Sequence, residues 1–156
     1  MSIQNSSPKE ANEITSVLRR SILELCGPDY NNDQTILEEW VENKTEENIK
    51  SWIESENTIA VTGYLNSSVV GFGLASLKGE VLLMYVLPEQ KGKGYGASIY
   101  RSIETQLKTQ NVNRVIAYST ITAKAFYHKM GFTQFDDAIK VGSIDGEFPL
   151  EKFIAI

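Results

Sequence analysis

The first third of the chain carries apolar residues at helical spacing. Between Ser7-Pro8 and Gly27-Pro28 they recur with a period of about 3.6 residues, at Ile14, Val17, Leu18, Ile22 and Leu25. Serine before proline is typical of a helix start, and Gly-Pro of a helix end. The pattern predicts one helix here, a second after Asn32-Asp33 and a third after Thr45.

From residue 57 the pattern changes to short apolar runs that favour strands. Residues 58–62 and 68–73 are predicted to form an antiparallel hairpin, with its turn at Asn66-Ser67. The run from Glu80 to Leu87 is nearly all apolar and ends at Pro88. Such a run predicts a strand that is buried on both faces.

The remaining residues alternate between helix and strand. We expect an amphipathic helix over 96–110, a strand over 114–119, a short helix over 122–129 that ends at Gly131, and a closing antiparallel pair over 132–141 and 148–154. Because a long helix joins the strand that starts at Val81 to the one that ends near Tyr118, these strands should be parallel, with a right-handed crossover. The fold class is therefore α/β (α+β), a mixed sheet in a single domain over residues 1–156.

Composition and charge narrow the class of protein. Twenty acidic and fifteen basic residues among 156 give a net charge of −5, which argues against sequence-independent binding of nucleic acid. The single cysteine, Cys26, allows neither an internal disulfide nor a cysteine-based metal cage. The start lacks the features of a secretory signal, and the longest apolar run, Val81 to Leu87, is too short to cross a bilayer. We expect a cytoplasmic domain with neither nucleic acid nor membrane as a partner.

One short segment is a candidate binding site. Lys91-Gly92-Lys93-Gly94-Tyr95-Gly96 lies between the apolar strand and the amphipathic helix. A helix start offers unpaired N–H groups and partial positive charge, and glycines let the backbone curl around a phosphate. Neither G-x-x-x-x-G-K-[ST] nor G-x-G-x-x-G with a following acidic residue is present, which argues against a nucleoside triphosphate and a dinucleotide. The segment indicates another phosphate-bearing ligand, or a glycine-rich connection without a ligand.

Two segments resemble motifs of the GNAT superfamily of N-acetyltransferases. The stretch VLPEQKGKGYG, from Val86 to Gly96, is similar to motif A, V-x-P-x-x-[QR]-G-x-G-x-[GA], and AKAFYHKMGF, from Ala123 to Phe132, resembles A-x-x-F-Y-x-x-x-G-F. Lys91 replaces the usual Gln or Arg, and Thr120 replaces the asparagine often found before the last helix. The resemblance implies the GNAT fold: a mixed central sheet with a splayed parallel pair, N-terminal helices and a C-terminal antiparallel hairpin.

The resemblance also implies acetyl-CoA as cosubstrate, without a metal. Its pyrophosphate would lie at residues 91–96, and its pantetheine arm along exposed backbone of β-strand residues 84–86. The implied cofactor contacts are Met84, Tyr85, Val86, Lys91, Gly92, Lys93, Gly94, Tyr95, Gly96, Thr120 and Tyr127. A backbone N–H near Val86 would stabilise the developing oxyanion.

Tyr127 matches the tyrosine with which the family protonates the departing thiolate. The ordinary pKa of a phenol, near 10, lies above that of a thiol, about 8.5. Phe126 is interpreted as a core aromatic. Glu80 falls where the histone-acetylating branch keeps a catalytic glutamate, although Gly79-Glu80 also fits an exposed turn, and water could carry the proton instead. The loop with Asp29 and Tyr30 would wall the acceptor pocket, or simply join two helices.

The implied activity is transfer of an acetyl group from acetyl-CoA to a primary amine, on a small molecule or, as the second choice, a polypeptide. Net negative charge favours a cationic acceptor. A CoA- or acyl-CoA-binding sensor or interaction module without catalysis is the alternative from another class. The presence of Tyr127 favours the enzyme. An exposed strand of the C-terminal hairpin could support a homodimer.

Overall fold

The computed structural model describes residues 1–26, 28, 32–141 and 144–155. The helices are α1 (Ala11–Leu25), α2 (Gln34–Glu42), α3 (Glu46–Glu54), α4 (Tyr95–Thr109) and α5 (Ile121–Lys129). The strands are β1 (Ser2–Asn5), β2 (Thr58–Leu65), β3 (Ser68–Ser76), β4 (Glu80–Val86), β5 (Arg114–Ser119), β6 (Thr133–Gln134), β7 (Ile139–Val141) and β8 (Ile144–Phe153). Short 3-10 turns precede α1, at η1 (Pro8–Glu10), and follow β4, at η3 (Pro88–Gln90).

The strands form a mixed sheet in the order β1-β2-β3-β4-β5-β8-β6, with β7 paired to β8. β4 and β5 run parallel, and the other neighbours run antiparallel. The β2–β3 hairpin turns at Asn66 and Ser67, whose φ angles are +50° and +69°, as tight hairpin turns require. The predicted hairpin and the predicted parallel pair are both confirmed.

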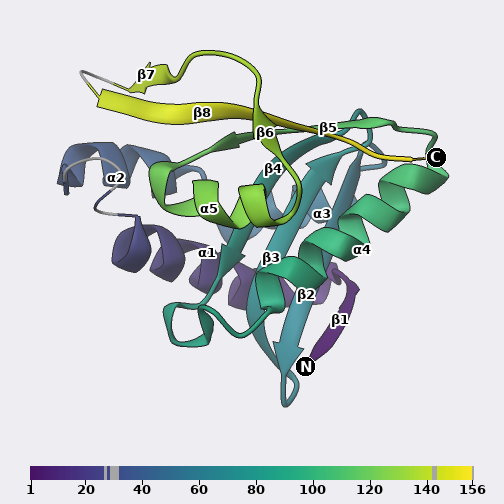
Figure 1. Ribbon diagram of the computed structural model, residues 1–156. Coiled ribbons are helices and arrows are strands. Elements are labelled where there is room, and N and C mark those ends of the chain that lie inside the picture. The colour runs from purple at the N-terminus through teal and green to yellow at the C-terminus, as the bar shows by residue number, and fades with distance from the viewer. Residues whose placement is uncertain (27, 29–31, 142–143, 156) are drawn as a thin grey trace.

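Helices cover both faces of the sheet (Figure 1). α4 and α5 lie on one face, while α1 and α3 lie on the other. The strands sort their side chains accordingly: Val61 and Val81 pack with α4, whereas Phe72 and Leu83 pack with α1. Each amphipathic helix is therefore stabilised chiefly by burying its apolar stripe against the sheet.

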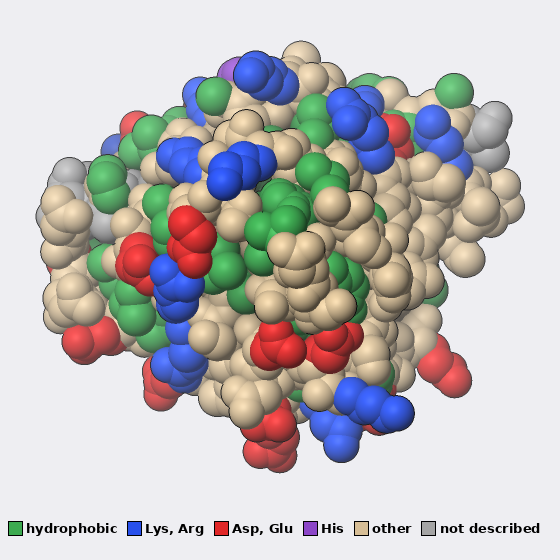
Figure 2. Space-filling model, turned by 90° about the horizontal axis from the view of Figure 1, so that it is seen from below, with side chains coloured by type: hydrophobic (Ala, Val, Ile, Leu, Met, Phe, Trp, Pro, Cys, Tyr) green, Lys and Arg blue, Asp and Glu red, His purple; other side chains and the backbone are tan. Residues whose placement is uncertain are grey.

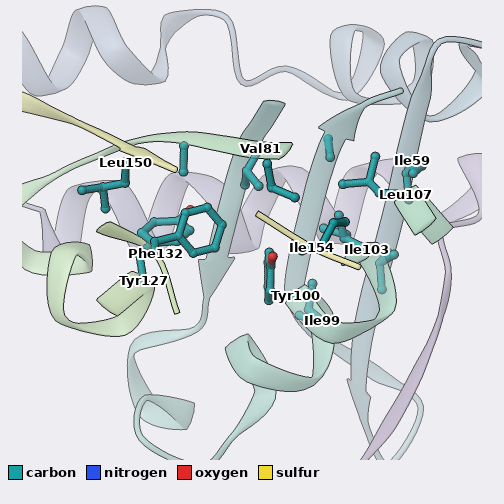
Figure 3. Close-up of a cluster of buried hydrophobic side chains, with 14 residues drawn as sticks. Ile59, Val81, Ile99, Tyr100, Ile103, Leu107, Tyr127, Phe132, Leu150 and Ile154 are labelled. Carbon is teal, nitrogen blue, oxygen red and sulfur yellow. The ribbon is translucent and has the colours of Figure 1, made fainter. Parts of the chain in front are cut away.

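Aromatic side chains fix α5 against the rest of the core. Tyr100 of α4 packs edge-on against Phe132, with ring centroids 5.4 Å apart, and Phe132 packs against Tyr127 of α5 at 5.2 Å. Figure 3 shows Tyr127 and Phe132 at one end of this core, with Ile59 and Leu107 at the other. The packing holds α5 beside the start of α4, where residues 91–96 (the glycine segment) lie.

Two predictions need correction, and one strand was not expected. β4 is not buried on both faces, because Leu82 is 44% exposed beside a cavity described below. The strand expected over 132–141 is divided into β6 and β7, because the Asp136 side chain and backbone accept hydrogen bonds from Asp137 N and Gln134 Nε2 and form a local turn. β1 was not expected, since it is polar and lies at the edge of the sheet, paired with β2.

The first helix also differs slightly from its prediction. Ser7 does accept a hydrogen bond from Lys9 N, but Pro8 begins a 3-10 turn and the α-helix starts at Ala11.

In the part of the chain that the structure describes, no helix is both long and apolar enough to cross a membrane.

Candidate active site

The parallel strands separate soon after they meet. β4 and β5 pair only at Glu80 with Ile116 and at Val81 with Ala117. The register between β3 and β4 then skips Leu82, so that this residue forms a β-bulge. A bulge twists and bends its strand. Beyond it, β4 keeps its pairing with β3, but none of its described residues pairs with β5.

The register decides which backbone groups face this open edge. Val86 lies opposite Gly71. The next two opposed residues, Leu87 and Val70, are hydrogen-bonded to each other, because Leu87 N donates to Val70 O. In an antiparallel ladder this makes Val86 and Met84 the residues whose own N–H and C=O groups point away from β3. The backbone of Tyr85 faces β3. Of the three residues expected to offer backbone to a ligand, only Met84 and Val86 do so.

The segment after β4 curls into the start of α4. Gly92 and Gly94 have φ angles of +80° and +89°, a conformation that costs glycine little and other residues more. Gly94 is the N-terminal cap of α4 and gives no side-chain cap. Among the described residues, no acceptor pairs with the N–H groups of 92 and 94–97. Five donors therefore remain available at the positive end of a helix.

Gly96 has a different role from the other two glycines. A Cβ atom at this position would lie 3.1 Å from Cε1 of Phe126. Glycine therefore lets the aromatic ring of α5 pack directly on the first turn of α4. Phe126 was interpreted as a core aromatic. It does pack against the core, but it is only partly buried and also lines a cleft.

This cleft, with a volume of about 310 Å³, lies between the glycine segment and α5. It is lined by Val86, Gln90, Lys91, Gly92, Gly94, Tyr95, Gly96, Ala97, Phe126, Lys129 and Met130. Tyr95 is almost fully buried. Figure 2, seen from the end of the molecule where this segment lies, shows Lys and Arg side chains there beside acidic ones. The sequence did not reveal Lys129 and Met130, because only the fold brings the end of α5 to this segment.

Tyr127 is buried between two aromatic rings. The ring centroids of Phe126 and Phe132 each lie 5.2 Å from its own. Burial raises the pKa of Tyr127 well above its ordinary value, because the charged phenolate is disfavoured away from water. No hydrogen bond joins the hydroxyl of Tyr127 to another described residue. A buried hydroxyl without a partner is costly, and a ligand atom could supply one.

A second cavity, of about 490 Å³, opens beside the bulge. Its lining is Ile36, Glu39, Trp40, Glu80, Val81, Leu82, Tyr85, Tyr118, Thr120, Val141 and Glu147. Three carboxylates therefore face one cavity, although no Lys, Arg or His is among its described lining residues. None of the three forms an ion pair with another described residue.

Most of the predicted site residues line one of these two hollows, but Met84, Lys93 and Tyr127 line neither. Glu80 is the first residue of β4, half-buried and lining the larger cavity, so it does not lie in an exposed turn. Thr120 lines the same cavity and not the cleft, and its hydroxyl caps α5 by accepting from Ala123 N at 3.2 Å. Asp29 and Tyr30 lie outside the described residues. Within the described ranges, no group of His, Cys, Asp and Glu is placed to hold a metal ion.

Known structures show the same fold. A GCN5-related N-acetyltransferase from Rhodopseudomonas palustris superposes with a TM-score of 0.85 at 16% identity, over 98% of this chain and 95% of its own. The PaiA N-acetyltransferase from Thermoplasma acidophilum, solved with coenzyme A, gives 0.82 at 20% identity over 98% of each chain. The aminoglycoside 6′-N-acetyltransferase from Enterococcus faecium gives 0.73 at 14% identity, over 100% of this chain and 98% of its own.

Sequence comparison gives the family. No curated protein sequence matches the chain significantly. The family model of the acetyltransferase (GNAT) domain, however, matches residues 26–146 and so covers most of the chain. The motifs, the splayed parallel strands and the match agree: the chain belongs to the GNAT family of acetyltransferases.

Proposed function

We propose that the protein transfers the acetyl group of acetyl-CoA to the primary amine of a small cationic molecule. The observation that carries the proposal is the continuity of two sets of backbone groups. The open edge of β4 at Met84 and Val86 leads directly into the five unpaired N–H groups of residues 92 and 94–97. The PaiA relative was solved with coenzyme A, which supports a CoA thioester as the ligand.

The residues of the cleft fit the parts of this ligand. The N–H groups at the start of α4 would bind the pyrophosphate, because anions are stabilised at helix N-termini. Lys91 and Lys129 in the cleft, and Lys93 between its glycines, would add positive charge to a protein whose net charge is −5. The amide groups of the pantetheine arm would pair with Met84 and Val86, as a missing strand would.

Acetyl-CoA would supply an activated thioester, and the amine nitrogen would attack its carbonyl carbon directly as the carbon–sulfur bond breaks. Tyr127 would donate its proton to the departing sulfur, and the proton released by the amine would restore the phenol. Its phenol is protonated at neutral pH, and no described residue pairs with its hydroxyl, which would bond to the sulfur. A backbone N–H of β4 near Val86, that of Met84, would stabilise negative charge on the carbonyl oxygen.

The larger cavity would receive the acceptor. Glu39, Glu80 and Glu147 reach it from α2, β4 and β8, and Trp40, Tyr85 and Tyr118 supply aromatic walls. Carboxylates and aromatic rings both attract ammonium groups. Glu80, beside the bulge, would take the proton from the attacking amine, directly or through water.

A panel of ligands and amines tests this proposal. Thermal unfolding should shift upward with acetyl-CoA but not with NAD or ATP, because a ligand that binds only the folded state stabilises it. Thiol release over a panel of amines, with mass spectrometry of the products, should then show acetylation of small cationic amines. Stabilisation by NAD alone would refute the assignment. Stabilisation by acetyl-CoA without turnover on any amine would favour the non-catalytic CoA-binding module, and turnover on peptides alone would favour a polypeptide acceptor.

A further inference from the structure

Two adjacent residues of α1 hold the segment that leads from β4 to the glycine segment. The Ser21 hydroxyl donates to the Val86 carbonyl at 2.8 Å. The Arg20 guanidinium makes two parallel hydrogen bonds to the Glu89 carboxylate, both 3.0 Å long. Val86 and Glu89 lie on either side of Pro88, so α1 restrains both ends of this turn.

Ser21 acts on the open edge of β4. Its side chain is buried, with the residue only 1% exposed, so its hydrogen bond is protected from competition with water. The bond occupies the Val86 carbonyl and leaves the Val86 N–H as the group available to a ligand. Without Ser21, this edge would present an unsatisfied acceptor and a strand end free to turn.

Arg20 acts on the turn that precedes Lys91. The Arg20 and Glu89 side chains are 41% and 50% exposed, and ion pairs this exposed add little to overall stability. Their fork geometry nevertheless fixes η3. Glycines such as Gly92 and Gly94 lose much conformational freedom when a ligand orders them, so a fixed neighbouring turn reduces the cost of binding.

We propose that Arg20 and Ser21 are positioning residues for the cofactor: they hold β4 and η3 in the geometry that acetyl-CoA binds. The inference rests on the proposed function, because it requires the cofactor at residues 91–96. The two residues act through Val86 and Glu89 and do not touch the reacting atoms. Their loss therefore weakens cofactor binding and leaves the chemical step unchanged.

Isothermal titration with acetyl-CoA tests the Arg20 fork without an acceptor. Arg20→Ala and Glu89→Ala should each raise Kd about two- to fivefold, the size expected for one exposed but well-oriented pair. The double variant should be no weaker than either single one, because both remove the same interaction. Glu24→Ala removes the other partner of Arg20, at 2.9 Å, and should leave Kd unchanged. Unfolding temperatures without ligand should agree among all four variants.

Ser21→Ala tests the second bond, and Thr15→Ala is its matched control. Thr15 is another α1 hydroxyl that donates to a main-chain carbonyl, that of Ala11, at 2.7 Å, but this bond stays within the helix. Ser21→Ala should raise KM for acetyl-CoA several-fold with kcat little changed, whereas Thr15→Ala should change neither.

The outcomes separate this inference from the proposed function. If the wild-type protein binds acetyl-CoA and the Arg20, Glu89 and Ser21 variants bind it equally well, the positioning role is wrong while the function stands. Additive losses in the Arg20–Glu89 double variant would also overturn it. If the wild-type protein does not bind acetyl-CoA, both proposals fall.

Discussion

At the scale of single residues, Tyr127 combines three features that bear on the proposed proton transfer. Its ring is fixed between Phe126 and Phe132, burial raises the pKa of its phenol, and no described residue pairs with its hydroxyl. The motif around it indicated a catalytic role from sequence. The sequence could not show that this hydroxyl lacks a hydrogen-bond partner among the described residues, because that depends on how three elements pack together.

Replacing Tyr127 by Phe removes only the hydroxyl. We expect kcat to fall about 100-fold, the lower range for loss of a general acid, while the Kd for acetyl-CoA stays within about twofold because the ring packing is retained. Steady-state kinetics with the best amine of the panel, together with calorimetry, measures both quantities. Unchanged turnover would remove Tyr127 from the mechanism.

Gly96 allows a second prediction at this scale. Gly96→Ala places a methyl group 3.1 Å from Phe126, so this ring, which lines the cleft, must shift by a few tenths of an ångström. Acetyl-CoA binding should weaken several-fold by calorimetry. Phe126→Leu, added to the same protein, should restore part of the affinity by making room. If the double variant binds no better than Gly96→Ala, the contact does not explain the glycine.

At the scale of elements, β4 shows how far the sequence could be interpreted. Its apolar run predicted a strand, and the helix after it predicted the parallel partner. The bulge at Leu82 was not predicted, because nothing in an apolar run indicates which of its residues the neighbouring strand β3 will leave unpaired. Because of the bulge, this apolar side chain is exposed beside a cavity instead of lying in the core.

A hydrogen bond between elements sets an expected pH dependence. The Tyr64 hydroxyl of β2 donates to Glu10 of η1 at 2.5 Å, and burial, with this bond, raises the pKa of Tyr64 to about 12. An unfolded tyrosine loses its proton near pH 10. Between these values the folded state binds more protons, so the free energy of unfolding should fall as pH rises.

Urea unfolding between pH 9 and about 11.5 measures this slope. Tyr64→Phe should make it shallower, although Tyr100 and Tyr127, whose pKa values burial also raises, would keep part of it. Tyr118→Phe, at an exposed position, is the control and should leave the slope as in the wild type. If the free energy of unfolding of Tyr64→Phe falls with pH as steeply as that of the wild type, the raised pKa of Tyr64 does not contribute to the pH dependence.

At the scale of the whole molecule, two hollows meet the region where β4 and β5 part. The cleft could be foreseen, because its glycines and the following helix are adjacent in sequence. The larger cavity could not: Glu39 and Glu147 lie far apart in the chain, and only the sheet order brings α2 and β8 to the same place. From the sequence, only the net charge indicated a cationic acceptor. We propose that this acceptor binds in the larger cavity, which three glutamates line.

Glu39→Gln and Glu147→Gln test that location. Each should lower kcat/KM for a cationic amine about three- to tenfold, chiefly through KM, because each removes one charge that attracts the acceptor. Glu38→Gln changes the net charge equally on the same helix, but Glu38 does not line the cavity. Equal effects at Glu38 and Glu39 would mean that only overall charge matters.

The central claim is that main-chain N–H groups at the start of α4 and on β4 bind coenzyme A. Amide chemical shifts of ¹⁵N-labelled protein, titrated with acetyl-CoA, report on these groups directly. The account predicts the largest changes at Gly92, Gly94, Tyr95, Gly96 and Ala97, with further changes at Met84 and Val86. Saturable binding that leaves these amides unchanged and shifts those of another surface would contradict it.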